Sequence, residues 1–409
     1  MIVVGMAHGT DSEKIGRHAA RSITGQLAGA EKVSWALVFC GGRHAPEAVL
    51  DGIRSELGNI DLYGGSTSGI ITSDYLGYSG YECGIIAFRD PLTTPRAILS
   101  DKLAEDEFTA GLELARTLEL TASPGDTVLL FYDNLKSSNP TVLHLASRLL
   151  KGFQARLQRD DLNIIGAGLL GDFAFHPSFV FNGSRTVKHA AMALTIPGNI
   201  LQSQSTIMHG CIPVSSFYEI TKISGPVLFE LNGRPALEVI ADNLGIDIDL
   251  LPDMTRSMSL TIGKKYGDPY APFDENQYIN RLIVGSDPRR GSVALFEDDF
   301  EVGDRIQIMS RDNTNMLQSV RTGTAALLES LKAAGKRIRF AFYIDCAGRA
   351  GKFSGCPEEE AALVAEKIPR DVPFLGFYSG VEIATLDKGC RPLDWTGLLT
   401  VFSDGTSNG

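Results

Sequence analysis

The amino-acid sequence predicts an α/β fold with mixed, partly parallel sheets, built from a repeated β-α-β-α-β-β unit and divided into two related halves. Three observations support this class. Apolar strands and amphipathic helices follow one another in that order three times along the 409 residues. A proline stands near the expected start of each second helix, and a glycine-rich segment follows each third strand. An apolar strand closes each unit.

The first unit occupies the first ninety residues. Its middle strand is continuously apolar, as is typical of a strand buried on both faces. Its second helix begins at Pro46 and carries its apolar residues on one face. The predicted elements are a strand at Ile2–Met6, a helix at Ser12–Leu27, a strand at Trp35–Cys40, the helix from Pro46, a strand at Ile60–Tyr63 followed by Gly64–Gly69, and a closing strand at Glu82–Phe88.

The second unit repeats the pattern. Here Asn139 is the expected N-cap of the second helix and Pro140 its first residue, a combination that suits a helix start. The other predicted elements are a strand at Arg96–Leu99, a helix at Glu105–Leu120, a strand at Val128–Tyr132, a strand at Leu162–Ile165 followed by Gly166–Gly171, and a closing strand at Ala190–Ile196.

The third unit carries an acidic start to its second helix. Pro357 precedes Glu358, Glu359 and Glu360, whose negative charge is favourable in the first turn of a helix. The other predicted elements are a strand at Arg305–Met309, a helix at Thr314–Ala334, a strand at Ile338–Ile344, a strand at Val372–Leu375 followed by Gly376–Gly380, and a closing strand at Gly397–Phe402.

Residues 202–304 lie between the second and third units. They contain a hairpin signal at Tyr218–Leu231, a helix that starts at Arg234-Pro235, and a strand pair within Leu282–Phe296. Whether this insert is a degraded fourth copy stays open. The polar stretch Pro197–His209 suggests a boundary, which gives one domain at residues 1–200 with two copies and a second at residues 201–409 with the insert and the third copy.

Composition excludes several classes of protein. The net charge of −11 and the absence of a dense Lys/Arg run argue against nucleic acid as a partner. No window of 18 apolar residues exists, so no membrane span is expected. The N-terminus lacks the basic start of a signal peptide, and the six cysteines form no Cys-x-x-Cys pair, which is typical of reduced thiols in a cytoplasmic protein.

No cofactor or metal is expected. The histidines and cysteines lack metal-ligand spacing. The glycine-rich segment Gly64–Gly69 lacks the Lys-Ser/Thr that completes a phosphate-binding P-loop, and no helix of a dinucleotide site follows it.

The candidate functional site follows the middle strand of the third unit. Asp345, Cys346 and Arg349 place a carboxylate, a thiol and a guanidinium in one short loop, and neither other unit has a comparable loop. A catalytic Cys346 would need a histidine base, and every histidine lies at or before His209, so the pattern favours a binding pocket. An enzyme centred on Cys346 and Asp345, and a protein-interaction scaffold, remain the alternatives.

A small polar ligand fits the residue types best. We expect Arg349 to hold a carboxylate or another anion, with Cys346 and Gly348 shaping the loop around it. Glu382 suits an amine, because a carboxylate pairs with an ammonium group. The hydroxyls of Ser66 and Thr67 and the ring of Tyr378 complete the predicted site.

Several motifs, taken in order, resemble the FIST domain family of F-box and intracellular signal transduction proteins. They are Gly64–Gly69, Gly210–Val214, Leu231–Leu237, Cys346–Arg349 and Gly376–Ser379. The resemblance spans roughly residues 25–200 and 215–385. It implies a sensory protein that binds small molecules such as amino acids, with no established enzyme activity. Sensors of this family are often fused to output modules, and no stretch here resembles one, so the resemblance implies a separate signalling partner such as a kinase or a receptor.

Overall fold

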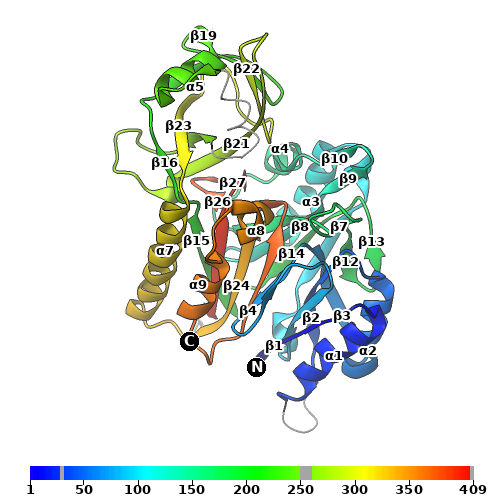
Figure 1. The fold of residues 1–409 in the computed structure, drawn as a ribbon. Coiled ribbons are helices and arrows are strands. Elements are labelled where there is room, and N and C mark those ends of the chain that lie inside the picture. The colour runs from blue at the N-terminus through cyan, green and yellow to red at the C-terminus, as the bar shows by residue number, and fades with distance from the viewer. Residues whose placement is uncertain (28–31, 249–259, 406–409) are drawn as a thin grey trace.

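The computed structural model describes residues 1–27, 32–248 and 260–405. Within these ranges the chain forms three six-stranded sheets, an eight-stranded sheet and a two-stranded hairpin. Figure 1 shows the eight-stranded part at one end of the molecule and the two termini at the other. The α/β class predicted from the sequence is confirmed.

The first sheet is built mainly from the first ninety residues. Its strands β2 and β3 are parallel, and the remaining neighbours are antiparallel. Helices α1 (Ser12–Thr24) and α2 (Pro46–Leu57) pack on one face. In spatial order the strands are β1 (Ile2–His8), β6 (Glu82–Phe88), β2 (Trp35–Gly41), β3 (Asp61–Thr67), β12 (Val180–Gly183) and β13 (Thr186–Val187).

The second sheet has the parallel pair β8 and β11 at its centre. It is covered by α3 (Glu107–Thr121) and α4 (Ala146–Arg156). In spatial order its strands are β7 (Arg96–Ser100), β14 (Ala191–Ile196), β8 (Thr127–Asp133), β11 (Asn163–Leu169), β26 (Val381–Leu386) and β27 (Gly389–Leu393). The separate hairpin is β9 (Leu135–Ser138) with β10 (Thr141–Leu143).

The third sheet holds the loop of the candidate site. Its parallel pair is β24 and β25, and α7 (Asn313–Ala333) and α9 (Glu360–Lys367) cover it, with the short α8 (Gly351–Ser354) at one end. In spatial order its strands are β15 (Leu201–Met208), β28 (Gly397–Asp404), β24 (Ile338–Cys346), β25 (Phe374–Ser379), β4 (Ile70–Thr72) and β5 (Leu76–Gly77).

The three sheets share one strand order and are interlocked. In each sheet, four neighbouring strands come from one segment of the chain. Their spatial orders are β1-β6-β2-β3, β7-β14-β8-β11 and β15-β28-β24-β25, so the first strand of each segment lies beside its closing strand. The outer two strands are a hairpin borrowed from elsewhere: β12–β13 joins the first sheet, β26–β27 the second and β4–β5 the third. Each of these three sheets therefore contains strands from two distant segments of the chain.

The insert forms a closed sheet, which we call the barrel. β23 pairs with β17 on one side and with β20 on the other, and this closes the ring. Its helix α5 (Ala236–Leu244) and the hairpin β17–β18 lie where the sequence predicts them. The strands are β16 (Cys211–Pro213), β17 (Tyr218–Ser224), β18 (Val227–Leu231), β19 (Arg234–Pro235), β20 (Leu260–Lys265), β21 (Tyr278–Asp287), β22 (Ser292–Leu295) and β23 (Arg305–Arg311).

The strand predicted at Arg305–Met309 is present, but its assignment to the third unit is wrong. Arg305–Met309 lies in β23 of the barrel, and the edge position beside β28 is taken by β15. β15 belongs to the polar stretch that the sequence suggested as a boundary. Its glutamine and serine residues are partly exposed because it is an edge strand, so the sequence lacks the apolar pattern that would predict a strand there. The alternating Ile306 and Ile308 of β23 face the barrel core instead.

Three further local predictions need correction. Asn139-Pro140 occupies the turn between β9 and β10, and α4 begins only at Ala146, so Asn139 caps no helix. The glycine-rich segments are the ends of β3, β11 and β25 and not turns after them. Pro357 likewise precedes its helix by three residues, since α9 begins at Glu360.

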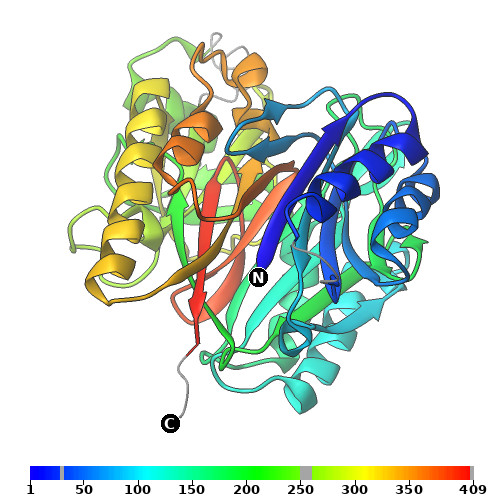
Figure 2. The ribbon, with the colours of Figure 1, turned by 90° about the horizontal axis from the view of Figure 1, so that it is seen from below.

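The main core lies between the three sheets. Phe39 of β2 is stacked on Phe377 of β25 at 4.1 Å between ring centroids, and Phe131 of β8 meets Phe39 edge-on at 5.5 Å. Figure 2 shows the strands meeting in the middle, with α1, α3 and α7 on the outside. Each sheet therefore buries one face in the shared core and the other under its own helices. None of the described helices combines the length and the apolar character that crossing a bilayer requires.

Close helix pairing in the first sheet gives a testable result. Gly52 of α2 packs against the backbone carbonyl of Glu13 in α1, so an added methyl group would overlap with backbone atoms. Replacing a helical glycine with alanine ordinarily adds up to about 1 kcal/mol of stability. We expect Gly52→Ala to lower the melting temperature instead. Gly323→Ala is the control, because an added methyl group on that glycine of α7 would meet side-chain atoms of Met208 and Thr206 and no backbone atom within 4 Å. An equal fall in both variants would contradict this account.

Candidate functional site

A buried polar cluster lies at the carboxyl end of β24, and we call it the Asp345 cluster: Asp345, Arg349, Glu360 and Tyr378. The side chain of Asp345 is fully buried, and neither carboxyl oxygen has a hydrogen-bond partner among the described residues, although Oδ1 lies 3.5 Å from Arg349 Nε, within ion-pairing distance. Tyr378 of β25 occupies the neighbouring register position, and its hydroxyl also has no partner in the described part of the chain. Two adjacent buried polar groups thus lack the bonds that buried groups ordinarily make.

Arg349 lies in a single 3-10 turn, Ala347–Arg349, that follows β24 directly. Its Nε donates to Glu360 Oε1 at 2.5 Å and its Nη2 donates to Glu360 Oε2. Its Nη1 donates to the carbonyl oxygens of His209, at 3.1 Å, and Trp395, at 2.8 Å. The guanidinium therefore holds a protein carboxylate where the sequence predicts the carboxylate of a ligand.

Glu360 is the member of the cluster that the sequence does not reveal. It stands in a run of three glutamates that resembles the exposed first turn of a helix, yet it is only 1% exposed. The late start of α9 turns it toward Arg349, eleven residues earlier in the chain. The packing of α9 on the third sheet brings Glu360 to Arg349, so no local pattern in the sequence could have identified this ion pair.

The electrostatics of the cluster favour a protonated Asp345. Burial raises the pKa of Asp345 well above its ordinary range, and the nearby Glu360 carboxylate raises it further against the opposing effect of Arg349. Burial also raises the pKa of Glu382, although Ser379 Oγ donates to its Oε1 at 2.7 Å. One guanidinium thus compensates one carboxylate, and burial favours the protonated form of the other two carboxyl groups, those of Asp345 and Glu382.

Cys346 and Gly348 are packed against their surroundings in the loop that follows β24. Cys346 is 7% exposed, and burial raises the pKa of its thiol well above the ordinary value, which is the opposite of nucleophile activation. Gly348 lies against the ring of Trp395, where a larger residue would collide with that ring. His209 does lie beside this loop, but its Nδ1 accepts from the backbone N–H of Cys211 at 2.9 Å. The enzyme alternative gains no support from these contacts.

The two predicted hydroxyl groups have protein partners. Ser66 Oγ accepts from the backbone N–H of Phe179 at 3.0 Å, away from the Asp345 cluster. Thr67 Oγ1 donates to the carbonyl oxygen of Tyr378 at 2.9 Å and so ties β3 to β25. Six residues of the predicted site lie at one end of the third sheet: Thr67, Tyr378, Cys346, Gly348, Arg349 and Glu382. Ser66 precedes Thr67 in β3, and its hydroxyl bonds to Phe179 instead.

Aromatic rings from three segments cover the cluster. Tyr78 meets Tyr378 edge-on at 5.7 Å, Phe173 meets Tyr78 at 5.6 Å, and Phe353 of α8 is stacked on Phe173 at 4.3 Å. The hydroxyl of Tyr78 donates to Glu359 Oε1 at 2.8 Å, just before α9. Figure 1 places α8 at the end of the third sheet that faces the barrel. The cluster is thus closed by side chains of separate loops.

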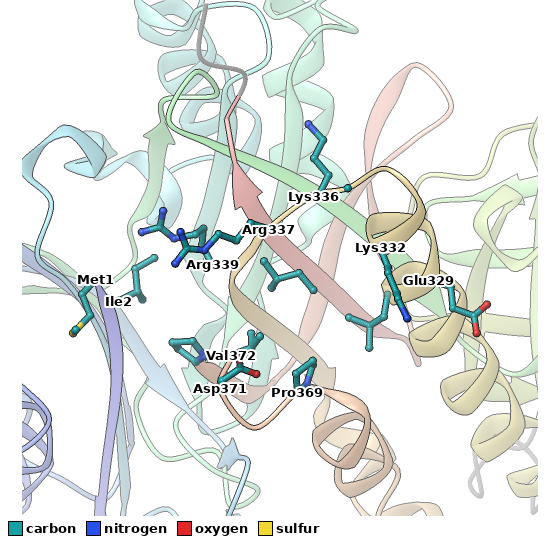
Figure 3. Close-up of a pocket in the computed structure, with 14 residues that line it drawn as sticks. Met1, Ile2, Glu329, Lys332, Lys336, Arg337, Arg339, Pro369, Asp371 and Val372 are labelled. Carbon is teal, nitrogen blue, oxygen red and sulfur yellow. The ribbon is translucent and has the colours of Figure 1, made fainter.

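An open pocket of about 810 Å³ lies at the opposite, amino end of β24. Figure 3 shows Met1 and Ile2 on one side of it and Glu329 and Lys332 of α7 on the other. Arg337 and Arg339 also line it, and Arg339 Nη1 is paired with Asp404 Oδ1 at 2.5 Å. No residue of the predicted site lines this pocket.

A metal centre finds no support in the described ranges, because no three His, Cys, Asp or Glu side chains there converge as ligands. The six cysteines are all buried and unpaired by disulfides.

Two family models match successive parts of the chain. Residues 34–234 match the FIST N domain and residues 236–385 the FIST C domain. An uncharacterized protein of Mycobacterium tuberculosis is 25% identical over 246 residues, which cover 59% of this chain and 61% of that protein. One of Mycobacterium bovis is 24% identical over 245 residues, covering 59% and 60%. The match thus spans about three fifths of each relative's length.

Among solved structures, a cyanuric acid hydrolase from A. caulinodans aligns over 99% of this chain and 100% of its own, with a TM-score of 0.32 and 9% identity. That likeness is too weak to carry an argument. The two domain matches cover most of the chain and agree with the motifs in the sequence. The chain therefore belongs to the FIST family, whose domains are associated with signal transduction and the sensing of small ligands.

Proposed function

We propose that this protein is a sensor that binds a small polar metabolite with an amino group, such as an amino acid, at the Asp345 cluster. The observation that carries the proposal is the buried carboxyl group of Asp345 beside the hydroxyl of Tyr378, because neither group has a hydrogen-bond partner among the described residues and Arg349, the cation nearest Asp345, is already bound to Glu360. Leaving such groups unpaired costs about 1–3 kcal/mol each. A ligand amine between them would recover that free energy.

The charge balance selects an amine over an acid. Asp345, Glu360 and Glu382 surround a single guanidinium, that of Arg349, which is already bound to Glu360. An ammonium group offsets the excess of carboxyl groups and makes the charged form of Asp345 favourable. Binding then releases the proton that the raised pKa retains on Asp345, so ligand affinity rises with pH.

Access requires the cover to move. α8 has four residues, and Phe353 on it is 43% exposed. The helix is attached at its ends, where Gly351 N–H donates to Glu359 Oε2 at 2.9 Å and Asn313 Nδ2 donates to the carbonyl oxygen of Ser354 at 3.2 Å. We propose that ligand binding displaces α8 and that a separate signalling protein, such as a kinase or a receptor, detects the change.

A ligand panel tests the proposal by thermal shift. We expect at least one amino acid or small amine to raise the Tm, since a ligand at about 100 times its Kd adds about 2.7 kcal/mol of stability. Asp345→Asn keeps the shape of the side chain and should abolish the shift. Asp371→Asn is the control, because Asp371 lines the open pocket at the other end of β24. Stabilisation that persists in Asp345→Asn, or that only acids without an amine produce, would refute this site.

A further inference from the structure

The contact between the barrel and the third sheet contains a second group of unpartnered polar atoms. Strand register places them on one face of the barrel. Thr261 of β20 pairs with Met309 of β23, and Arg311 lies two residues further along, so Thr261 and Arg311 share a face. Asn280 of β21 pairs with Gly263, two residues after Thr261, and faces the same way.

This face is not the apolar interior of the barrel. The alternate residues Ile262 and Ile308 belong to the barrel core. Met309 of the polar face packs instead with Trp395 and with Met316 of α7. Thr261, Asn280 and Arg311 therefore lie at the junction of the barrel with the rest of the protein.

Four unpartnered buried atoms at this junction are hydrogen-bond donors. Arg311 Nε and Nη1 have no acceptor in the described chain, and neither does Trp395 Nε1. The fourth is His209 Nε2. Burial lowers the pKa of His209, and its Nδ1 accepts from Cys211 N–H, so the neutral ring carries its proton on Nε2.

The donors are held close together. The guanidinium carbon of Arg311 lies 3.9 Å from the centroid of the Trp395 ring. The backbones of His209 and Trp395 both accept from Nη1 of Arg349. Trp395 and His209 are each 1% exposed, and Arg311 is half-buried.

Arg311 differs from two other arginines buried near it. Arg349 is paired with Glu360, and Arg281 with Asp299 and Asp394. Arg311 has no carboxylate within ion-pairing distance in the described residues, and Glu275, the carboxylate nearest His209, is used by backbone N–H groups and by Ser319. Burial accordingly lowers the pKa of Arg311. Within the described residues, the junction therefore supplies hydrogen-bond donors and a cation that no carboxylate pairs with.

We propose that a small organic carboxylate binds at this junction, with its oxygens on Arg311, Trp395 and His209. A guanidinium is suited to hold a carboxylate through two parallel hydrogen bonds. Thr261, which lies on the strand next to Arg311, offers a second polar group of the ligand a hydroxyl that has no hydrogen-bond partner in the described chain. This site uses none of the side chains of the Asp345 cluster, so carboxylate binding here does not depend on amine binding there.

Tryptophan fluorescence provides the test, because the protein has two tryptophans. Trp35 is stacked on Phe88 in the first sheet, and Trp35→Phe leaves Trp395 as the reporter. Acetate, glycolate and succinate are titrated against chloride and inorganic phosphate at constant sodium concentration. We expect a saturable change in Trp395 emission with at least one carboxylate, and the same affinity from calorimetry on the unmodified protein.

The matched variants are Arg311→Gln and Arg305→Gln, two arginines of β23. Arg305 is exposed and contacts the ring of Phe217, so its substitution should leave binding unchanged. Arg311→Gln should weaken carboxylate binding at least tenfold while the protein stays folded, because no internal ion pair is lost. The proposal is overturned if no carboxylate gives a saturable response, if chloride and phosphate act equally, or if Arg311→Gln binds like the wild type. Asp345→Asn should leave this titration unaltered.

Discussion

Arg349→Ala is expected to lower the free energy of unfolding by about 3–5 kcal/mol, the range for breaking one side of a buried ion pair. The guanidinium and Glu360 are both within 1% of full burial. Removing Arg349 deletes two of the hydrogen bonds to the Glu360 carboxylate, which keeps only the longer one from Tyr343, and it removes the guanidinium donor from the carbonyl oxygens of His209 and Trp395. The loss is large because water cannot replace these bonds in the interior.

Urea denaturation measures this change through the midpoint and the slope. Arg370→Ala is the control, since Arg370 pairs with Asp74 on the surface, where the side chains are 74% and 86% exposed, and its midpoint should not move. The double variant Arg349→Met with Glu360→Met should recover most of the stability, because no uncompensated charge remains. A single variant as stable as the wild type would show that the pair contributes nothing net.

The second large effect is a loss of stability with rising pH caused by Glu297. This carboxyl group joins the barrel to α4: it accepts from the backbone N–H groups of Ala146 and Ser147, at 3.2 and 2.9 Å, and from Ser147 Oγ at 2.6 Å. Burial raises the pKa of Glu297 to about 8 from the ordinary 4.5, and Asp394 adds to the effect while Arg281 and Ser147 oppose it.

The sign follows from proton linkage. Below about pH 4.5 both the folded and the unfolded states hold the proton, and the contribution of Glu297 to stability is fully present. Between pH 4.5 and 8 only the folded state retains it, so stability falls as pH rises, by about 5 kcal/mol in total at 1.36 kcal/mol per pH unit. Asp394, whose pKa burial raises to about 6, acts in the same direction.

Unfolding free energies from pH 5 to pH 9 check the prediction. The difference between the wild type and Glu297→Gln isolates this group from the rest, and it should grow in favour of the variant as the pH rises. Glu301→Gln is the control, because Glu301 is exposed in the same loop and pairs only with the exposed Lys151. Equal pH dependence in the wild type and Glu297→Gln would contradict the raised pKa.

Local patterns in the sequence were sufficient to predict the positions of most strands and helices. The apolar runs of β2, β8 and β24 and the amphipathic helices α1, α3 and α7 lie within a few residues of the predicted positions. The hairpin β17–β18 and the helix α5 of the insert were also predicted correctly. These predictions succeed because burial on one or two faces imposes a period on the residues of the element itself.

The sequence predicted which residues meet at the end of β24 but not which group binds Arg349. Asp345, Cys346 and Arg349 do lie at one strand end with Tyr378 beside them, since parallel neighbours end together. The partner of Arg349, however, was expected to be a ligand and is Glu360. Whether the cluster binds a metabolite stays a prediction.

The sequence by itself determined the α/β class, the order of strands and helices and the reactive composition of the 345–349 loop. Only the tertiary structure decided that β15 and not β23 completes the third sheet, and that each six-stranded sheet contains a hairpin from a distant segment. It also decided that Glu360 pairs with Arg349, while no carboxylate of the described residues pairs with Arg311. The physical reason is that periodicity reports which face of an element is buried, whereas strand pairing and buried ion pairs depend on which distant surface covers that face.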